Sequence, residues 1–183
     1  MSKLSIQPEL KSGHFSKYIN EAKMKIVSKL VEVHVLRKKG NQLQFLLLKR
    51  SENELYPGIW QMVSGKIRNK ENALTTAQRE LKEETGLSPL KLWVAPKVNS
   101  FYDQHTDTIN LIPVFAALVE YNSPVIISRE HSKYLWLSKN DAIKKMAWYE
   151  QRTAVNIITD YFLKEMNFLN FVEVKKTKKY YCG

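Results

Sequence analysis

Apolar and polar residues alternate along the first clearly patterned segment of the chain. From Lys29, the run KLVEVHVLR places an apolar side chain at nearly every second position. Turn-forming residues follow at 39–41, and QLQFLLLKR then resumes as an apolar run that ends at Arg50. A period of two is typical of a strand with one buried face. Two such runs joined by a short turn predict a β-hairpin.

Beyond residue 56 the pattern becomes mixed. A turn is predicted at 56–58, followed by one strand over IWQMVSG at 59–65. Residues 70–85 predict a helix, which Gly86 is placed to end, with Pro89 discouraging any continuation. The remaining expected elements are strands at 91–102, 109–120 and 134–137, and helices at 15–24, 141–146 and 150–168.

Strands around one central helix, with a second helix near the end, predict a layered α/β domain. A chain of 183 residues, 44% of them hydrophobic, suits a single domain with a real core rather than a disordered chain. We expect an N-terminal extension at 1–27, the main domain at 28–170 and a basic tail at 171–183. No pattern in the sequence fixes an oligomeric state.

The charge balance is strongly basic, with 29 lysines and arginines against 18 acids, which gives +11 at pH 7. Such a surface attracts nucleotide polyphosphates, but it equally suits RNA or an acidic membrane. Much of the excess lies at 175–179, where the alternative is a solvated tail. No apolar run is long enough to cross a bilayer, the first residues lack a signal-like apolar segment, and Cys182 is the single cysteine. We therefore expect a cytoplasmic protein without a membrane partner.

The candidate chemistry lies in the helix predicted over 70–85. At about 100° per residue, Glu80, Glu83 and Glu84 fall within an arc of roughly 100° on one helix face. Carboxylates this close raise each other's pKa unless a cation neutralises them. Oxygen ligands of this kind suit Mg²⁺ or Mn²⁺, which also bind phosphate oxygens. The pattern therefore predicts a divalent-metal cofactor.

The spacing extends over 65–87: Gly65, five residues, Glu71, seven residues, and then Arg-Glu-Leu-x-Glu-Glu-x-Gly-Leu from Arg79. It resembles the Nudix box without a mismatch. The alternative is a solvated amphipathic helix whose acids balance Lys70 and Lys82. The resemblance implies a MutT-like Nudix hydrolase over about 29–165. It also implies an α/β/α sandwich with a mixed central sheet, and a metal-dependent enzyme that cleaves phosphoric anhydride bonds.

The same resemblance assigns roles to the residues of the box. It implies a metal-ligand set of the Gly65 carbonyl and the carboxylates of Glu80, Glu83 and Glu84. Arg79 would orient the catalytic carboxylate, and the general base would be Glu83 or Glu84. We expect Glu71 in the first turn of the helix, either supporting the ligands or simply stabilising the helix end.

Segments outside the box resemble one branch of the family. WQMVSG (60–65), REHSKYLWLS (129–138) and AWYEQRTAV (147–155) are similar to deoxy-ATP and dihydroneopterin triphosphate pyrophosphohydrolases. The Glu-His-x-x-Tyr-x-Trp-Leu part also occurs in asymmetrical diadenosine tetraphosphate hydrolases. This branch implies a metal role for Glu130 and a phosphate contact for Arg50. The alternatives are a surface acid and a strand-end side chain in solvent.

Further substrate contacts follow from the same branch and from charge. Trp60 and Tyr149 offer flat faces to a base or pterin ring, or else pack in the core. Lys66 and its basic neighbours Arg68 and Lys70 suit a long polyphosphate or an RNA 5′ end. The expected substrate is a nucleoside or pterin triphosphate, cleaved to monophosphate and pyrophosphate. Alternatives are a dinucleoside polyphosphate hydrolase, an RNA 5′-end pyrophosphohydrolase and an RNA-binding Nudix protein; RNA is not favoured, because pure binding needs no clustered acids.

Overall fold

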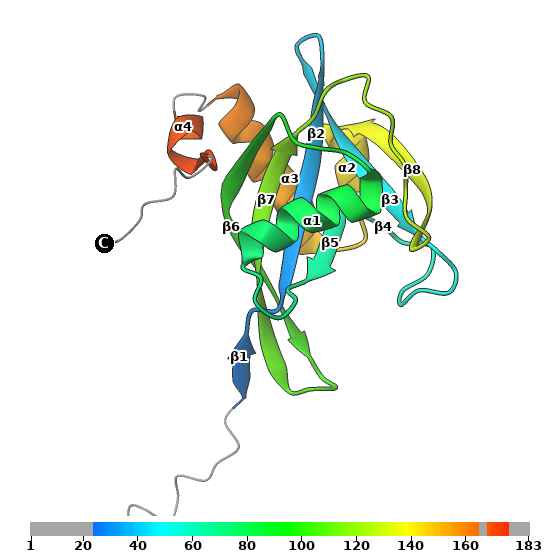
Figure 1. Cartoon of the computed structure of the whole chain (residues 1–183), viewed down its shortest axis with the longest axis vertical. Coiled ribbons are helices and arrows are strands. Elements are labelled where there is room, and N and C mark those ends of the chain that lie inside the picture. The colour runs from blue at the N-terminus through cyan, green and yellow to red at the C-terminus, as the bar shows by residue number, and fades with distance from the viewer. Residues whose placement is uncertain (1–23, 165–167, 176–183) are drawn as a thin grey trace, which may run out of the picture.

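The computed structural model describes residues 24–164 and 168–175, which form one mixed sheet covered by helices (Figure 1). The strands are β1 (Lys25–Val27), β2 (Leu30–Lys39), β3 (Gln42–Arg50), β4 (Trp60–Gln61), β5 (Val63–Lys66), β6 (Lys91–Asp103), β7 (Thr108–Leu118) and β8 (His131–Ser138). The helices are α1 (Ala73–Thr85), α2 (Lys139–Lys145), α3 (Tyr149–Leu163) and α4 (Leu169–Val172). No helix in the described ranges is both long and apolar enough to span a bilayer.

Strand β2 lies at the centre of the sheet. It pairs antiparallel with β3 near its end and with β5 near its start, and it runs parallel to β7. Strand β6 is antiparallel to β7, and β8 is antiparallel to β3. Strand β1, inside the segment expected as an extension, runs parallel to β7. The sheet is therefore mixed, as predicted.

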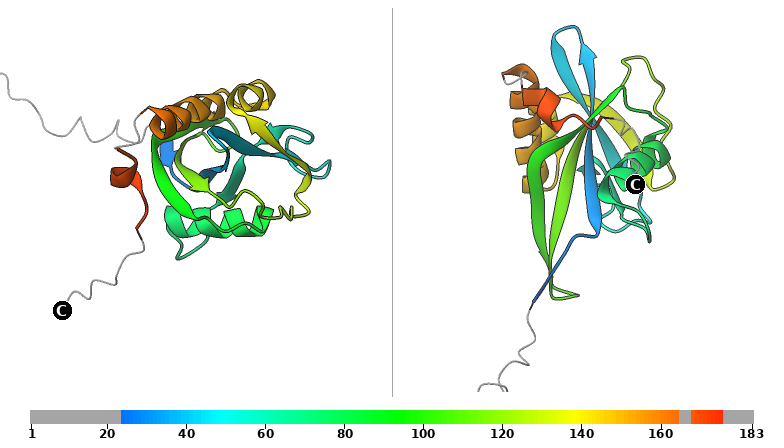
Figure 2. Two further views of the ribbon diagram at one scale, coloured as in Figure 1. Left: turned by 90° about the horizontal axis from the view of Figure 1, so that it is seen from above. Right: turned by 60° about the vertical axis from the view of Figure 1, so that its left-hand side comes forward.

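Alternate side chains of β2 enter two separate cores. Val31, Val33 and Val35 pack with Ala77 and Leu81 of α1 on one face of the sheet. On the opposite face, a second core joins the sheet to α2 and α3. The view from above shows α1 on one side of the strands and α2 with α3 on the other (Figure 2). The predicted α/β/α sandwich is confirmed.

The predicted hairpin is confirmed as β2 and β3, with Lys39 opposite Gln42. The single strand expected over 59–65 is wrong, because the chain changes partner within it. Strand β4 pairs with β3, whereas β5 pairs with β2. Between them lies Met62, whose side chain is fully buried in the core. This change of partner directs β5 toward α1.

Helix α1 begins later than its periodicity suggests. Lys70 has a left-handed φ of 67°, and Asn72 caps the helix by accepting a hydrogen bond from the Thr75 amide. Glu71 therefore precedes the helix, and its expected place in the first turn is wrong. The other end is as predicted, since Gly86 takes the left-handed conformation with φ 71°.

The helix expected over 150–168 ends at Leu163, and a separate short helix, α4, begins at Leu169. Residues 165–167 lie outside the described residues, as does all but the last residue of the helix expected at 15–24. After α4, the amide of Val174 donates to the carbonyl of Leu92, and the backbone of Glu173 forms an antiparallel β-bridge with that of Trp93. The start of the expected basic tail is thus attached to β6.

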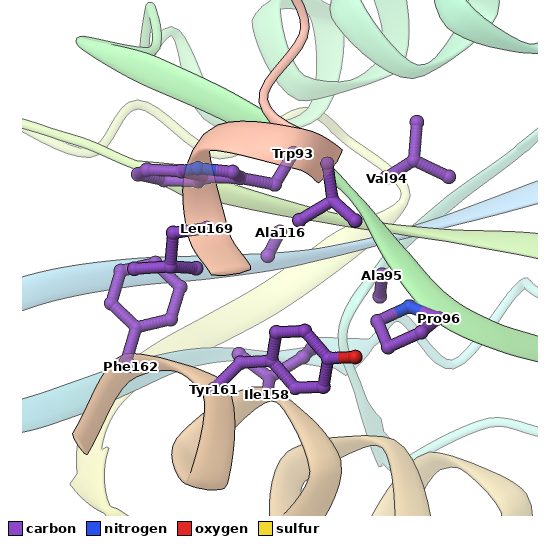
Figure 3. A pocket seen from close by; sticks show the side chains of 10 residues that line it. Trp93, Val94, Ala95, Pro96, Ala116, Ile158, Tyr161, Phe162 and Leu169 are labelled. Carbon is purple, nitrogen blue, oxygen red and sulfur yellow. The ribbon is translucent and has the colours of Figure 1, made fainter. Parts of the chain in front are cut away.

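An apolar hollow lies between β6, α3 and α4 (Figure 3). Trp93 and Phe162 meet edge to face in it, and Leu169 of α4 covers it. The free space is about 10 Å³, no more than one water molecule needs. This hollow is a packing seam between α4 and the domain rather than a ligand site.

Candidate active site

Strand β5 and helix α1 bring the acidic edge of the helix onto the backbone of Gly65. A Cβ built on Gly65 would lie 2.0 Å from both Cδ and Oε1 of Glu80. The carboxylate of Glu80 thus occupies the space that any other residue would fill. Burial raises the pKa of Glu80, and a hydrogen bond from Arg79 partly offsets this.

Gly65→Ala should therefore displace the Glu80 carboxylate, because 2.0 Å is far below any tolerable contact. We expect turnover to fall at least a hundredfold, since a carboxylate moved by about 1 Å no longer serves a reacting centre. The measurement is kcat at saturating metal, with circular dichroism to confirm folding. Gly40→Ala is the control for side-chain space, because a Cβ there meets nothing within 4 Å; its positive φ, which Gly65 does not share, adds backbone strain to the control alone. Equal activity of Gly65→Ala and wild type would contradict the close packing.

Arg79 connects the acids of the site. Its guanidinium donates two hydrogen bonds to Glu71, at 2.8 and 3.0 Å, and one to the carbonyl of Lys66 at 3.0 Å. It also contacts Glu80 at 2.7 Å and Glu83 at 2.9 Å. The pair with Glu71 lowers the pKa of that carboxyl to about 2. Glu71, although outside the helix, thus anchors the arginine that faces the other acids.

Glu83 is the most exposed of the three helix acids, and two arginines hold it. Arg68 donates to both of its carboxylate oxygens, at 3.2 and 3.0 Å, and Arg79 to one of them. Lost hydration raises the pKa of Glu83, but the hydrogen bonds from Arg79 and Arg68 outweigh it, so the pKa lies below its usual value. Glu83 is therefore ionised at neutral pH.

Glu84 lies at the opposite extreme, with a side chain only 5% exposed. The Ser64 amide donates to Oε1 at 3.4 Å, whereas Oε2 has no hydrogen-bond partner within the described residues. Burial, followed by the charges of Glu80 and Glu130, raises the pKa of Glu84 well above its ordinary value. This buried, repelled carboxylate is the strongest electrostatic anomaly of the site.

Sequence reasoning missed His131, which stands beside Glu84. Its ring is fully buried, with Nε2 3.7 Å from Oε2 of Glu84. Burial, assisted by the charge of Arg50, lowers the pKa of His131 to about 4, so the ring is neutral near pH 7. The only available signal was its position one residue after Glu130, where β8 begins opposite Arg50.

The turn that carries Glu130 is attached to the end of β3. The Ser51 amide donates to the Glu130 carbonyl at 2.9 Å, and the Ser51 hydroxyl donates to the Arg129 carbonyl at 2.9 Å. Arg50 is held by Glu54 at 3.2 Å and by the Leu55 carbonyl at 2.6 Å. The charges of Glu130 and Arg50 both act on Glu84. Of the two, the charge of Glu130 raises the pKa of Glu84 and that of Arg50 lowers it.

The remaining candidates lie at the margins. Lys66 is exposed next to Gly65. Trp60 packs partly against the core, and the Lys145 ammonium lies 5.1 Å from its ring centroid. The Trp60 carbonyl accepts from the amide of Ala147, two residues before Tyr149, whose side chain is 75% exposed. Trp60 and Tyr149 therefore belong to neighbouring segments, and Tyr149 is the one that is open to a ligand.

The chemistry of this donor set fits a divalent cation. Within residues 24–164 and 168–175, no three acidic, histidine or cysteine side chains already surround one point as metal ligands. The charges of Glu80 and Glu130 nevertheless both repel the Glu84 carboxylate, whose Oε2 lacks a hydrogen-bond partner within the described residues. A hard cation would relieve this repulsion and supply that partner.

Comparison with known proteins agrees with this geometry. Residues 29–156 match the model of the NUDIX domain. The asymmetrical bis(5'-nucleosyl)-tetraphosphatase of Mus musculus is 29% identical over 127 residues, covering 67% of this chain and 83% of that protein. Nucleoside triphosphatase NudI of Klebsiella pneumoniae is 28% identical over 109 residues, covering 55% and 77%.

A solved structure shows the same fold. The Caenorhabditis elegans Ap4A hydrolase, in a binary complex, superposes with a TM-score of 0.65 at 22% identity, covering 74% of this chain and 98% of that one. The family match spans well over half of the chain and includes the acidic helix and the strands that hold it. The chain therefore belongs to the Nudix family of pyrophosphohydrolases, which act on phosphoric anhydride bonds with the help of divalent metal ions.

Proposed function

We propose that this Nudix hydrolase cleaves a nucleoside or pterin triphosphate to the monophosphate and pyrophosphate, with Mg²⁺ or Mn²⁺ as cofactor. The ligands would be the Gly65 carbonyl and the carboxylates of Glu80, Glu83, Glu84 and Glu130. The observation that carries the proposal is Glu84, which is buried, repelled by two neighbouring carboxylates and unpartnered at Oε2. Such a carboxylate destabilises the fold unless a cation joins it.

The protein's own contribution is mainly positioning, as phosphoryl chemistry requires. Bound divalent metal would neutralise the polyphosphate and acidify an attacking water. Arg79 fixes Glu80 and Glu83 relative to one another. Glu83 or Glu84 would accept the proton from the water. Arg50 and Lys66 would supply positive charge for the phosphates.

A second candidate is dinucleoside polyphosphate hydrolysis, favoured by the similarity to the mouse tetraphosphatase. It uses the same acids and the same water attack on phosphorus. The difference lies in the leaving group, a nucleotide instead of pyrophosphate. RNA 5′ ends are a third substrate class, for which the basic side chains of Lys66 and Arg68 beside the helix are the supporting feature.

One panel separates these functions. Deoxy-ATP, deoxy-GTP, dihydroneopterin triphosphate, diadenosine tetraphosphate, ADP-ribose and triphosphorylated RNA are each incubated with Mg²⁺, and the products are identified by chromatography. We expect pyrophosphate from a triphosphate, loss of activity with EDTA, and recovery with Mg²⁺ or Mn²⁺. Activity that persists in EDTA would refute the metal mechanism. Preferential cleavage of diadenosine tetraphosphate would replace the first proposal with the second.

A further inference from the structure

A second buried polar cluster lies on the face of the sheet opposite α1. It consists of Glu32 on β2, Asn99 on β6 and Gln151 on α3, which are 6%, 2% and 4% exposed. Asn99 Nδ2 donates to Glu32 Oε2 at 2.6 Å, and Gln151 Nε2 donates to Glu32 Oε1 at 3.2 Å. Three chain segments thus bring one carboxylate and two carboxamides together in the interior.

The cluster is incompletely satisfied. The carbonyl oxygens Asn99 Oδ1 and Gln151 Oε1 have no hydrogen-bond partner within the described residues. Their orientation follows from the carboxylate, because each amide turns its NH₂ group toward Glu32 and its oxygen away. Buried acceptors without donors are unfavourable and call for an explanation. What the cluster lacks is N–H groups.

The cluster is also close to the acidic site. Glu32 stands opposite Ser64 in the pairing of β2 with β5, and the Ser64 amide donates to Glu84. Neighbouring strands are about 4.8 Å apart, so the backbone of Glu32 is one strand spacing from the Ser64 backbone that contacts Glu84. Because the cluster and α1 lie on opposite faces of the sheet, a nucleotide with its phosphates at α1 would extend past β5 to place its ring at the cluster.

The cluster adjoins the partly exposed start of α3. Gln151 lies in its first turn, next to Tyr149, which is largely exposed, and Trp148, which is half-exposed. Glu150 forms an ion pair with Lys97 of β6, and both charges act on Glu32. This ion pair is partly exposed, and Tyr149, next to Glu150 in the chain, offers a flat face for stacking.

We propose that Glu32, Asn99 and Gln151 bind the donor edge of a 2-amino-4-oxopyrimidine ring, the ring shared by guanine and pterins. Such a ring presents an N–H beside an exocyclic amino group, which matches a carboxylate and two carbonyl oxygens. Adenine presents a ring nitrogen acceptor beside its amino group, so it would place acceptor against acceptor. This inference rests on the proposed triphosphate hydrolysis and narrows its substrate class.

Binding of monophosphates to the metal-free protein tests the proposal without requiring turnover. Isothermal titration compares GMP, dihydroneopterin monophosphate, IMP, which lacks the 2-amino group, and AMP. We expect GMP or the pterin to bind at least tenfold more tightly than AMP, with IMP between them. The tighter of the first two identifies the natural ring. Equal affinity for all four compounds would overturn the proposal.

Glu32→Gln tests whether the cluster causes the preference for GMP or the pterin over AMP. The side chain keeps its shape, but one carboxylate oxygen, an acceptor, becomes an NH₂ group, a donor. We expect the tenfold preference to disappear in this variant. If Glu32→Gln does not fold, Gln151→Met removes the unpaired carbonyl with little change in volume and should weaken the preference in the same way. Thr159→Val is the matched control, since Thr159 is a buried polar residue of α3 bonded only within its helix.

The outcomes separate this inference from the proposed function. A variant that melts earlier but keeps the full ring preference would show that the cluster is only structural, which overturns the inference. Hydrolysis of all nucleoside triphosphates at equal rates would also overturn it, while leaving the proposed reaction intact. A protein that hydrolyses no triphosphate but still prefers GMP in the titration would refute the reaction and support the ring site.

Discussion

Glu84→Gln is expected to abolish most activity while making the metal-free protein more stable. Turnover at saturating Mg²⁺ should fall by about a thousandfold, since losing a charge that holds the catalytic metal typically costs several kcal/mol at the barrier. The metal-free fold, in contrast, loses a carboxylate that burial and two neighbouring acids make unfavourable. The amide keeps the same shape and can still accept from Ser64.

The pH dependence of stability gives the matching measurement. The pKa of Glu84 is raised in the folded state, so unfolding releases its proton, and the free energy of unfolding falls as pH rises from about 4.5 through the folded pKa. Wild type should therefore lose stability relative to Glu84→Gln over this range, as measured by thermal melts with EDTA. Added Mg²⁺ should stabilise wild type more than the variant. If the melting temperatures of wild type and Glu84→Gln differ by the same amount at every pH, the raised pKa of Glu84 in the folded protein is refuted.

Arg79→Lys should lower both turnover and stability, because one ammonium cannot reproduce the contacts of the guanidinium. Arg79 holds Glu71 with two hydrogen bonds, contacts Glu80 and Glu83, and reaches the Lys66 carbonyl. We expect turnover to fall about a hundredfold and the free energy of unfolding to fall by about 2 kcal/mol, the scale of a lost charged hydrogen bond.

Arg68→Lys is the control for this variant. Arg68 also makes two hydrogen bonds to Glu83, but its side chain is 59% exposed and it contacts no other acid of the helix. An exposed pair of this kind contributes little, so turnover should fall less than tenfold. Steady-state kinetics measure the loss of turnover in both variants, and urea titrations measure the loss of unfolding free energy. Equal losses in the two variants would mean that Arg79 acts only through Glu83.

Local rules were sufficient for much of the fold. The hairpin was readable because alternation and turn residues act within a few positions, and the end of α1 because Gly86 alone suits a left-handed cap. The division of residues 59–65 into two strands, β4 and β5, could not be predicted from the local sequence. Its cause is a change of partner strand at Met62, which depends on residues distant in sequence.

In the candidate site too, local geometry could be predicted from the sequence, whereas contacts that depend on tertiary packing could not. Fixed spacing placed Glu80, Glu83 and Glu84 on one edge of α1, since a helix turns by a constant angle. The place of Glu71 was missed because Lys70 adopts a left-handed conformation that side chains rarely take. His131 and the cluster around Glu32 were missed as well, because tertiary packing alone brings β2, β6, β8 and α3 next to their partners.

The attachment of residues 172–174 to β6 also bears on solubility. Among the described strands, β6 pairs with β7 along one edge. At its other edge, Glu173 forms a β-bridge with Trp93, and the Val174 amide donates to the Leu92 carbonyl. Open strand edges are templates for pairing with other molecules, and proteins commonly cover them. Residues 173 and 174 thus cover part of an edge that would otherwise be open to pairing. A chain shortened before Leu169 would keep the catalytic acids yet expose Trp93 and this edge, and it would aggregate more readily.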